Sequence, residues 1–533
     1  VKNERDHINI DNLSLKDSET FELLQRGETT GIFQLESRGM RDYLKQLVPN
    51  DFEDIVSMNA LYRPGALGMN MVDSYINRKH GREEVTYGHE SVKKILSTTY
   101  GVIVYQEQVM QIAQELSGFS LGQADILRRA MGKKKKEEME SLRSTFVDGA
   151  VKKDVNERYA ANLFDQIEQF AGYGFNRSHS VGYALIAYQT AWLKTHFPAE
   201  FMASVLSCDL GNTDNIQLFV DDCRNIGLSV EKPDINRSSY RFEDLDSRTI
   251  LYGLGAIKGI GESLVEQIVS QRNIEQFKDM HDFCMRIGSN RINRRILTTL
   301  IGSGAMDSFG EREDLFRRID SYLKNAEQAS ERNKSNIQDL FGEEIISPAE
   351  DVVNDDIEFD EVSSEWSALG FYLDSHPLES KKKEVRNMCG FFISELQSEE
   401  HTQRIAGCLM QFNVRQGKRG RFAFATLDDG SSKIEVSIWA DVFEKYRSLL
   451  KKGQVLVVEG MIEKDEYSNF AKHKMIADKI LTFDQARHEY VKNIKIDIEN
   501  NDISSEELVN SLKLIANSSE GNQVLISYKG ESA

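Results

Sequence analysis

The hydrophobic periodicity of this chain changes from the helical to the strand period along its 533 residues. Through residues 1–230 apolar side chains recur at i, i+3 and i+4, most clearly in segments 107–116 and 181–196. The second segment places five side chains on one apolar stripe: Val181, Ala184, Leu185, Tyr188 and Trp192. Ser178 or Ser180 is suited to cap its start, because a hydroxyl oxygen can accept from a free N–H of the first turn.

Residues 401–485 instead carry short runs rich in β-branched and aromatic residues, separated by turn residues. Three such runs are 421–427 (RFAFATL), 433–439 (KIEVSIW) and 454–458 (QVLVV). This spacing predicts a small all-β barrel after the helical part, so the chain is expected to be multidomain.

Three further stretches differ in composition from the helical part and from the barrel. Residues 231–310 contain a glycine-bearing segment followed by an amphipathic helix, and residues 311–400 form a charged, partly helical linker whose acidic part is expected to be solvated. Residues 486–533 begin another unit.

The composition argues against a membrane-spanning protein and against a disulfide- or zinc-stabilised one. Hydrophobic residues make up 40% of the chain, and no run of about 18 apolar residues exists to span a membrane. The five cysteines are odd in number and lack metal-ligand spacing, which favours a reduced, cytoplasmic protein without structural zinc. The net charge is −19, yet basic residues concentrate between Arg128 and Lys136 and acidic residues between Glu343 and Glu365. The start at Val1 without a methionine suggests a fragment.

The strongest local signal is the cationic segment 128–136 (RRAMGKKKK), in which six of nine residues are basic. Arginine guanidinium groups bind phosphate oxygens in bidentate fashion, and lysines add point charges. The segment therefore suits a triphosphate tail or a DNA backbone. The alternative is a solvated, charged helix end.

A second signal is the loop 172–180 (GYGFNRSHS), which leads into a helix. A glycine-bearing loop before a helix N-terminus presents backbone N–H groups to an anion. Tyr173 and Phe175 are suited to stack on a base, and His179 to donate to a phosphate. The alternative is an ordinary loop with a serine cap and a structural histidine.

Segment 257–262 (IKGIGE) opens a helix and looks like a helix-hairpin-helix turn. In such a turn the Gly-x-Gly backbone presents N–H groups to one DNA phosphate, which positions a duplex without reading its sequence. Lys258, Gly259 and Gly261 are the expected DNA-binding residues. A second, weaker copy lies in 293–307, and the alternative is a glycine turn between two packed helices.

In the barrel segment, Phe422 and Phe424 alternate onto one strand face near four basic residues: Arg415, Lys418, Arg419 and Arg421. Aromatic faces with flanking basic side chains are the usual means by which an oligonucleotide-binding barrel holds single strands. Lys418 and Arg421 are the expected DNA contacts. In the alternative interpretation both phenylalanines belong to the barrel core.

Carboxylates suited to catalysis are not apparent in the sequence. Nucleotidyl transfer by two metals needs clustered carboxylates. Asp244 and Asp246 form an acid-x-acid pattern, but they lie in a stretch (EDLDSR) typical of a hairpin turn. The acidic residues of 351–361 have the composition of a linker. We therefore predict no catalytic residue and no metal site in this chain.

Six motifs in collinear order resemble the C family of DNA polymerases, the alpha subunits of bacterial DNA polymerase III. They are 33–40 (FQLESRGM), 63–67 (RPGAL), 78–83 (RKHGRE), 105–113 (YQEQVMQIA), 127–135 (LRRAMGKKK) and 172–180 (GYGFNRSHS). The resemblance covers nearly the whole chain, and six motifs in order make chance implausible.

The resemblance implies a map of the chain. Residues 1–230 correspond to the polymerase fingers, 231–310 to tandem helix-hairpin-helix units and 401–485 to the family's oligonucleotide-binding (OB) barrel. In the family the palm, whose aspartates hold Mg²⁺, comes earlier, so those ligands would precede Val1. The contact with the proofreading subunit would also lie in that missing part.

The resemblance assigns two groups of residues to the incoming dNTP: Arg128, Arg129 and Lys133 at its triphosphate, and Tyr173, Asn176 and His179 in the nascent base-pair pocket. A sliding-clamp-binding peptide would correspond to 337–341 (IQDLF), where Asp339, Leu340 and Phe341 match and Ile337 replaces a glutamine. Residues 486–533 would begin the domain that binds the clamp-loader tau subunit, a contact expected to be lost or weak here.

The leading hypothesis is therefore a fragment of a DNA-templated DNA polymerase, inactive alone, that binds dNTP, primer–template duplex, single-stranded DNA and the sliding clamp. Two alternatives stay open. One is a non-catalytic scaffold that binds DNA and the clamp, and the other is the error-prone alpha paralogue, which usually lacks a good clamp peptide.

Overall fold

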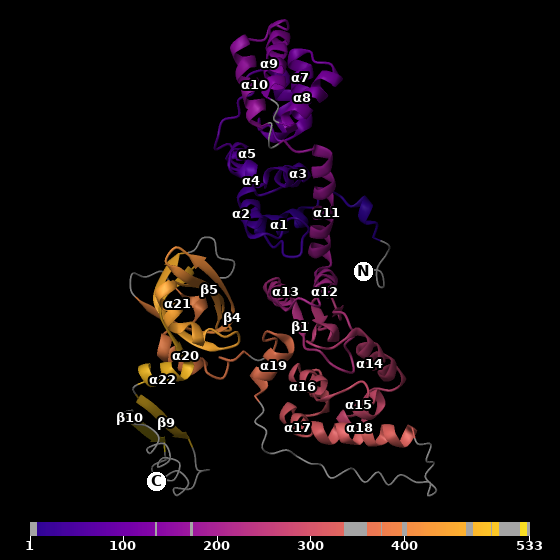
Figure 1. The fold of residues 1–533 in the computed structure, drawn as a ribbon, viewed down its shortest axis with the longest axis vertical. Helices are drawn as coiled ribbons and strands as arrows, with labels where there is room; N and C mark the ends of the chain where they lie inside the picture. The colour runs from indigo at the N-terminus through magenta and orange to yellow at the C-terminus, as the bar shows by residue number, and fades with distance from the viewer. Residues whose placement is uncertain are drawn as a thin grey trace. The chain divides into compact units, whose positions relative to one another are not determined.

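The computed structural model describes residues 8–133, 136–170, 174–334, 360–374, 376–396, 402–464, 473–491, 493–499 and 523–529 (Figure 1). It divides into two compact units. The first comprises residues 1–231 and 238–253, and the second comprises residues 232–237 and 254–533. Each unit is described by itself below.

The first unit is helical apart from one small sheet. Its helices are α1 (Ser18–Arg26), α2 (Arg38–Leu47), α3 (Phe52–Leu61), α4 (Pro64–Leu67), α5 (Met71–Lys79), α6 (Glu90–Leu96), α7 (Gln106–Ser117), α8 (Leu121–Lys133), α9 (Lys136–Val151), α10 (Glu157–Phe170), α11 (Arg177–His196), α12 (Pro198–Cys208) and α13 (Thr213–Asn225), with single 3-10 turns at Ile10–Asn12 and Ser97–Thr99. The sheet has the order β1 (Ser229–Glu231), β3 (Thr249–Leu251), β2 (Glu243–Asp244), in which β3 is parallel to β1 and antiparallel to β2.

Two hydrophobic cores pack the helices before α12, while α12 and α13 bury further apolar side chains. One gathers buried side chains from α1, α2, α3, α5 and α11, and the other gathers them from α6, α7, α8, α9 and α10. The 20-residue α11 runs beside α1 and α3 (Figure 1), which it contacts through small residues that let the backbones approach closely. The buried face of this helix carries Ala184, Ala187, Tyr188 and Ala191.

The structure confirms the helices predicted at 107–116 and 181–196, and corrects two details of the second. Leu185 was expected on the buried stripe, yet its side chain is 37% exposed, because the face packed on α3 is the alanine-rich one. Neither serine caps the helix. Asn176 is the N-cap, and Ser180 is buried and donates to the carbonyl of Val56 over 2.5 Å.

The second unit begins with short helices and continues into a barrel. Its elements are a 3-10 turn (Leu254–Ala256), α14 (Glu262–Ile274), α15 (Met280–Ile287), α16 (Arg294–Gly302), a 3-10 turn (Asp307–Phe309), α17 (Arg312–Arg317), α18 (Ile319–Lys334), α19 (Glu361–Leu369), α20 (Lys382–Cys389), a 3-10 turn (Ile393–Glu395), β4 (Gln403–Gly417), β5 (Gly420–Asp428), β6 (Lys433–Ile438), α21 (Ala440–Tyr446), a 3-10 turn (Arg447–Leu449), β7 (Val455–Lys464), β8 (His473–Thr482), α22 (Phe483–Tyr490), β9 (Asn493–Glu499) and β10 (Gln523–Lys529).

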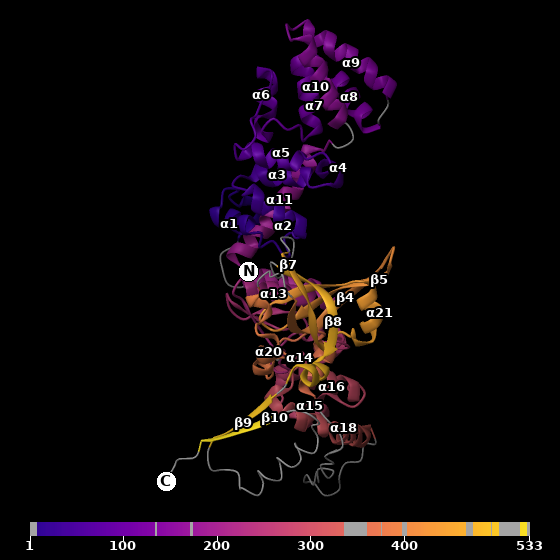
Figure 2. The same ribbon diagram turned by 90° about the vertical axis from the view of Figure 1, so that its left-hand side faces the viewer.

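Strands β4 to β8 close into a barrel in the order β4-β5-β6-β8-β7, antiparallel except where β6 meets β8, and α21 lies beside β5 (Figure 2). The predicted fold class, mostly helical followed by a small all-β barrel, is confirmed. Strands β9 and β10 form a separate parallel pair.

The acid-x-acid stretch is a hairpin turn, as predicted. Strand β2 ends at Asp244 and pairs with β3, and the N–H of Leu245 donates to the carbonyl of Thr249 over 2.9 Å. The Asp246 carboxylate accepts from the N–H of Arg248 at 2.7 Å, which is ordinary turn chemistry. Within the described ranges no helix combines the length and the apolar content that crossing a bilayer would need.

Candidate nucleic-acid interface

The two predicted phosphate-binding arginines lie on α8 and share one partner. Arg128 donates to Asp125 Oδ1 from Nε at 3.0 Å and from a terminal nitrogen at 2.8 Å, and a terminal nitrogen of Arg129 lies 2.8 Å from Asp125 Oδ2. Asp125 stands one turn earlier on the same face, because helical residues three and four apart are neighbours. The hydrogen bond from Arg128 is the largest reason why the pKa of Asp125 lies below its ordinary value.

Two guanidinium groups on one carboxylate leave an excess of positive charge on this face. The Arg129 side chain is 67% exposed and that of Arg128 is 36% exposed. Exposed ion pairs contribute little to stability, so an incoming anion can exchange with Asp125 at small energetic expense. Lys133 ends α8, but its side chain lies outside the described residues, and so does Tyr173.

The described part of the glycine-bearing loop joins the two cores of the first unit. Phe175 forms a parallel bridge with Tyr105, directly before α7. Asn176 accepts from the N–H of His179 at 2.8 Å and donates from Nδ2 to Glu107 at 2.7 Å. Because both polar atoms of the Asn176 side chain are engaged within the protein, its place in the structure is that of a residue that orients the start of α11.

Aromatic side chains from three segments lie in a row on this surface, with neighbouring rings tilted or edge-on, and we call this row the aromatic ladder: Phe33, Tyr183, His179 and Phe175. Successive ring centroids lie 5.4, 4.3 and 5.4 Å apart. The Arg63 guanidinium carbon lies 4.3 Å from the Phe175 ring centroid and extends the row with a cation–π contact. Burial lowers the pKa of Arg63.

Sequence reasoning had placed Phe175 and His179 here and had missed the other members of the ladder. Tyr183 follows His179 by one helical turn, so the i, i+4 spacing alone was a usable signal. Phe33 and Arg63 lie in two of the motifs that carry the family resemblance, but no local pattern indicates that they meet α11.

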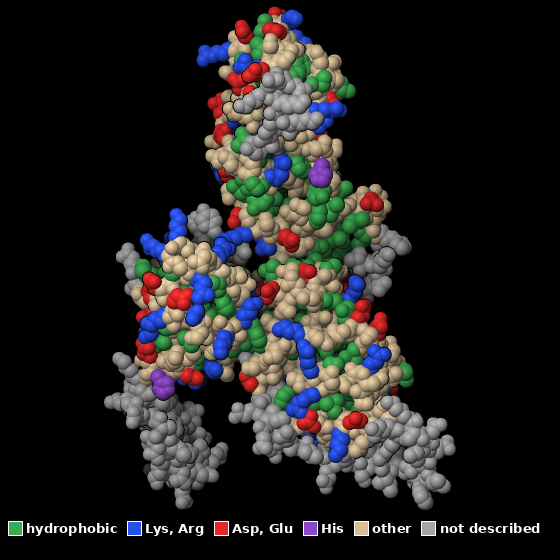
Figure 3. Space-filling view, viewed as in Figure 1, with side chains coloured by type: hydrophobic (Ala, Val, Ile, Leu, Met, Phe, Trp, Pro, Cys, Tyr) green, Lys and Arg blue, Asp and Glu red, His purple; other side chains and the backbone are tan. Residues whose placement is uncertain are grey.

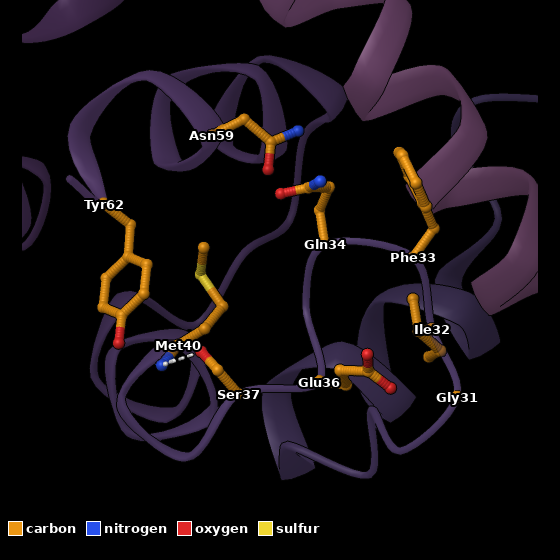
Figure 4. A pocket seen from close by; sticks show the side chains of 9 residues that line it. All are labelled: Gly31, Ile32, Phe33, Gln34, Glu36, Ser37, Met40, Asn59 and Tyr62. Carbon is orange, nitrogen blue, oxygen red and sulfur yellow. Dashed lines mark hydrogen bonds between the residues drawn. The ribbon is translucent and has the colours of Figure 1, made fainter.

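A pocket of about 630 Å³ adjoins the end of this ladder. Figure 4 shows its lining, which comes from the loop 31–37 and from α2, α3 and the residue after α3: Gly31, Ile32, Phe33, Gln34, Glu36, Ser37, Met40, Asn59 and Tyr62. Gln34 has a φ of +65°, a left-handed conformation that residues other than glycine adopt rarely. Ser37 Oγ accepts from the N–H of Met40 at 3.4 Å and caps α2.

A buried lysine fixes the loop that lines this pocket. Lys194 Nζ on α11 donates to the carbonyl of Thr30 at 2.9 Å and to Asp222 Oδ2 on α13 at 2.7 Å. Burial lowers the pKa of Lys194, and Asp222 opposes that shift. Thr29 Oγ1 closes the other side of the loop by donating to the carbonyl of Leu35 at 2.6 Å. The pocket wall is therefore pre-formed.

In the second unit, the helix-hairpin-helix turn has an open glycine pair. Gly259 has a φ of +80° and Gly261 is the N-cap of α14, and apart from the adjacent residues no atom of the described ranges lies within 4 Å of where a Cβ on either would stand. Such a surface admits close approach of a backbone phosphate. Lys258 is engaged by α19: its N–H donates to the carbonyl of Ala368 at 3.0 Å and its Nζ to that of Trp366 at 3.4 Å.

The weaker second copy has a filled turn. Gly304 has a φ of +81°, and a Cβ there would lie 2.5 Å from the guanidinium of Arg312. Arg312 donates to both oxygens of Asp307 at 2.7 and 2.8 Å, and Lys232 donates to Asp307 at 2.6 Å. This ion-pair cluster occupies the space that a phosphate would need, so the open turn at Gly259 is the better candidate for a DNA site.

The outer face of the barrel carries the two phenylalanines about which the sequence left two interpretations. Ala423, Ala425 and Leu427 of β5 point into the core, whereas Phe422 and Phe424 lie on the other face and are partly exposed. Their outward direction favours the stacking interpretation over the core one.

Basic residues surround this aromatic face. Lys418 and Arg419 are exposed in the turn between β4 and β5, and the Arg415 guanidinium carbon lies 5.5 Å from the Phe424 ring centroid. Arg421 is paired with Glu444 of α21 at 2.9 Å. Figure 3 shows Lys and Arg side chains spread over the barrel face turned to the viewer.

Residues 339–341, the proposed clamp contact, lie outside the described residues. Over the described ranges, no three His, Cys, Asp or Glu side chains gather into a group that could hold a metal ion.

Comparison with known proteins agrees with this layout. The model of the bacterial DNA polymerase III alpha subunit finger domain matches residues 1–154, a helix-hairpin-helix motif matches 227–315, and an OB-fold nucleic acid binding domain matches 404–482.

Curated relatives match along almost the whole chain. The DNA polymerase III subunit alpha of Escherichia coli K12 is 43% identical over 537 residues, which cover 96% of this chain and 45% of the relative. The subunit of Haemophilus influenzae is 42% identical over 95% of this chain and 45% of its own length, and that of Pseudomonas fluorescens is 40% identical over 94% and 45%. The chain thus spans about 45% of the length of these relatives, and it belongs to the family of bacterial DNA polymerase III alpha subunits.

Proposed function

We propose that this chain is the nucleotide- and DNA-binding part of a DNA-templated DNA polymerase. The observation that carries the proposal is the pair of arginines on α8, Arg129 exposed and Arg128 partly exposed, which share the single carboxylate of Asp125. A dNTP triphosphate brings several negative charges, and two arginine forks can bind its oxygens in bidentate fashion. The name of the curated relatives supports the assignment.

In this proposal the two arginines stabilise the negative charge of the nucleotide's phosphates during the reaction. As the new phosphodiester bond forms, negative charge develops on the leaving pyrophosphate, and fixed guanidinium groups stabilise it. Asp125 holds both side chains on one face until the nucleotide takes its place. Mg²⁺ would be held by polymerase residues outside this chain, where it supplies charge neutralisation at the phosphates.

The ladder and the loop around it would line the nascent base pair. His179 and Tyr183 are exposed and stacked, and a base can extend their stack because every base has a π-face. Asn176 would set the direction of α11 through its bond to Glu107. Tyr173 and Lys133 stay predicted contacts of the nucleotide.

DNA would be held at two places in the second unit. The open turn at Gly259 and Gly261 would bind a duplex phosphate with backbone N–H groups. Lys418 and Arg421 would contact single-stranded DNA beside the aromatic face of the barrel. Because Lys258 is engaged by α19, its proposed role is limited to adding positive charge near the turn.

The remaining contacts complete the proposal. Asp339, Leu340 and Phe341 would bind the sliding clamp, and the tau and proofreading subunits would contact the polymerase mainly elsewhere. We also propose that the protein is located in the cytoplasm.

The test is nucleotide binding by the 533-residue chain in the presence of primer–template DNA. We expect a fluorescent dNTP analogue to bind, and the double substitution Arg128→Ala with Arg129→Ala to weaken that binding about ten- to a hundred-fold. Arg143→Ala is the matched control, because Arg143 is also exposed and paired with a single carboxylate, Asp165, at 3.0 Å.

Two results are informative beyond the expected one. Equal weakening by Arg143→Ala would mean that general charge, rather than the α8 face, binds the nucleotide. DNA binding without any nucleotide binding by the wild-type chain would overturn the proposal in favour of the non-catalytic scaffold.

A further inference from the structure

The pocket beside the ladder has the dimensions and lining of a small-ligand site. Its volume of about 630 Å³ falls within the range of roughly 300–1,000 Å³ usual for such sites. Phe33 and Tyr62, which are partly exposed, supply apolar surface, whereas Ile32 and Met40 of the lining are buried. Figure 4 shows the carboxamides of Gln34 and Asn59 turned toward each other at one side of the hollow.

The charge of the lining selects against a phosphate. None of the nine described residues that line the pocket is a lysine or an arginine, and one of them is Glu36. An anion there would meet a like charge and find no cationic partner, whereas a neutral planar group with hydrogen-bonding edges would fit. A nucleobase has these properties and a triphosphate does not.

The two amides carry unused hydrogen-bonding capacity. Asn59 Nδ2 is buried and makes no hydrogen bond among the described residues. Leaving such a donor unpaired is unfavourable, so a ligand group that pairs with the Asn59 amide would bind favourably. Gln34 is exposed and keeps a left-handed backbone, which concentrates at ligand sites because surrounding contacts must enforce it.

The aromatic ladder leads to this pocket. Phe33 lines the pocket, and its ring also contacts that of Tyr183 in a tilted arrangement with centroids 5.4 Å apart. Tyr183 is exposed, so bases of a strand that follow the ladder have an aromatic surface on which to stack.

We propose that this pocket binds one unpaired nucleobase of a single DNA strand, with the neighbouring bases stacked along the ladder. Adenine is the favoured base, because its edge offers a donor and an acceptor side by side to a carboxamide. The inference rests on the proposed function, since it assumes that the first unit meets DNA.

The test uses the 533-residue chain and a single-stranded oligothymidylate that contains one 2-aminopurine, a fluorescent purine with a donor and an acceptor on its edge. We expect a saturable change in 2-aminopurine fluorescence. Asn59→Leu should weaken binding about five- to tenfold, because it removes the amide at similar volume. Gln34→Gly should weaken it similarly, and glycine keeps the positive φ without strain.

Controls separate the pocket from general effects. Gln111→Leu makes the same kind of change at an exposed residue of α7, a helix of the other core, and should bind the probe as the wild type does. An oligothymidylate with an abasic site in place of the 2-aminopurine should bind the wild type several-fold more weakly. Circular dichroism of each variant confirms that it is folded.

Three outcomes would overturn the proposal. They are wild-type affinity in both Asn59→Leu and Gln34→Gly, equal affinity for the abasic oligomer, and equally tight binding of free 2-aminopurine deoxyriboside monophosphate, which would make the ligand a mononucleotide. None of these outcomes depends on Arg128 or Arg129. They can therefore contradict the nucleobase pocket without contradicting the triphosphate site, and loss of the triphosphate site would leave the pocket proposal untouched.

Discussion

The indole of Trp439 lies 5.5 Å from the ring of Phe422, centroid to centroid, on the outer face of the barrel. Phe424 completes the group, 5.5 Å from Phe422 and 6.3 Å from Trp439. Trp439 is 48% exposed, although large aromatic side chains are usually covered. An exposed aromatic triad next to basic side chains is the arrangement with which OB barrels hold single strands.

Trp439→Ala should therefore weaken binding of single-stranded DNA while leaving the barrel folded. Loss of one base–aromatic stack is worth about 1–3 kcal/mol, so an affinity loss of roughly tenfold is expected. Fluorescence anisotropy with a labelled oligothymidylate measures it. Met461→Ala on β7 is the control, because Met461 is similarly exposed at 46%. Equal losses in both variants would argue against the stacking face.

Lys418 should contribute more to single-strand binding than Arg421. Arg421 is already paired with Glu444 at 2.9 Å, whereas Lys418 is exposed in the turn between β4 and β5. We expect Lys418→Ala to reduce the slope of log affinity against log salt by about 0.7, the value for one lost phosphate contact to a single strand. Arg421→Ala should change the slope less. The opposite order would show that the Glu444 pair opens on binding.

Asp125→Asn should raise the affinity for a nucleoside triphosphate about two- to fivefold. The substitution removes the carboxylate that competes with phosphate for Arg128 and Arg129, and an exposed helical pair contributes little to folding. Titration of the same fluorescent dNTP analogue measures the change. A lower affinity in this variant would mean that Asp125 orients the arginines for phosphate instead of competing with it.

The stability of the second unit should fall in acid through Asp307. Burial raises the pKa of this carboxyl group, but the bonds from Arg312 and Lys232 outweigh it, so the folded-state pKa lies below the ordinary value of 3.8. Its stabilisation is therefore fully present above pH 3.8 and is lost as the pH falls through the lower folded-state pKa.

Asp307→Asn should remove this part of the acid dependence. It removes the carboxylate that accepts two hydrogen bonds from the buried Arg312, so the free energy of unfolding at neutral pH should drop by about 1–3 kcal/mol. Urea denaturation at neutral pH and at successively lower pH values measures both effects. An unchanged acid slope in the variant would show that other carboxylates dominate the acid transition.

The large features of the fold follow from the sequence because hydrophobic periodicity reports local structure. Helices α7 and α11 and strands β5, β6 and β7 appear near their predicted ranges for this reason. The buried face of α11 was harder to predict. Its contact with α3 is a property of two segments, so Leu185 on the edge of the apolar stripe became exposed.

The same distinction between local and long-range contacts applies to the candidate sites. Asp125 is one turn from Arg128 and Arg129, so its pairing follows from local spacing, which the sequence contains. By contrast, the stacking of Phe33 on Tyr183 joins residues 150 positions apart (183 minus 33), and the pairing of Lys258 with α19 joins segments that one sequence cannot place together. Alternation placed Phe422 and Phe424 on one face, but only the closed barrel decides which face is outside.

The central claim, that α8 holds the triphosphate of an incoming nucleotide, is tested most directly in the intact polymerase subunit that contains this sequence. Single-nucleotide incorporation should be measured with Arg128→Ala and Arg129→Ala, together with primer–template affinity. The account predicts a loss of about ten- to a hundred-fold in kcat/KM for each variant, with DNA affinity unchanged, because each removes one charge-assisted phosphate contact. Unchanged kcat/KM with normal DNA binding would contradict it.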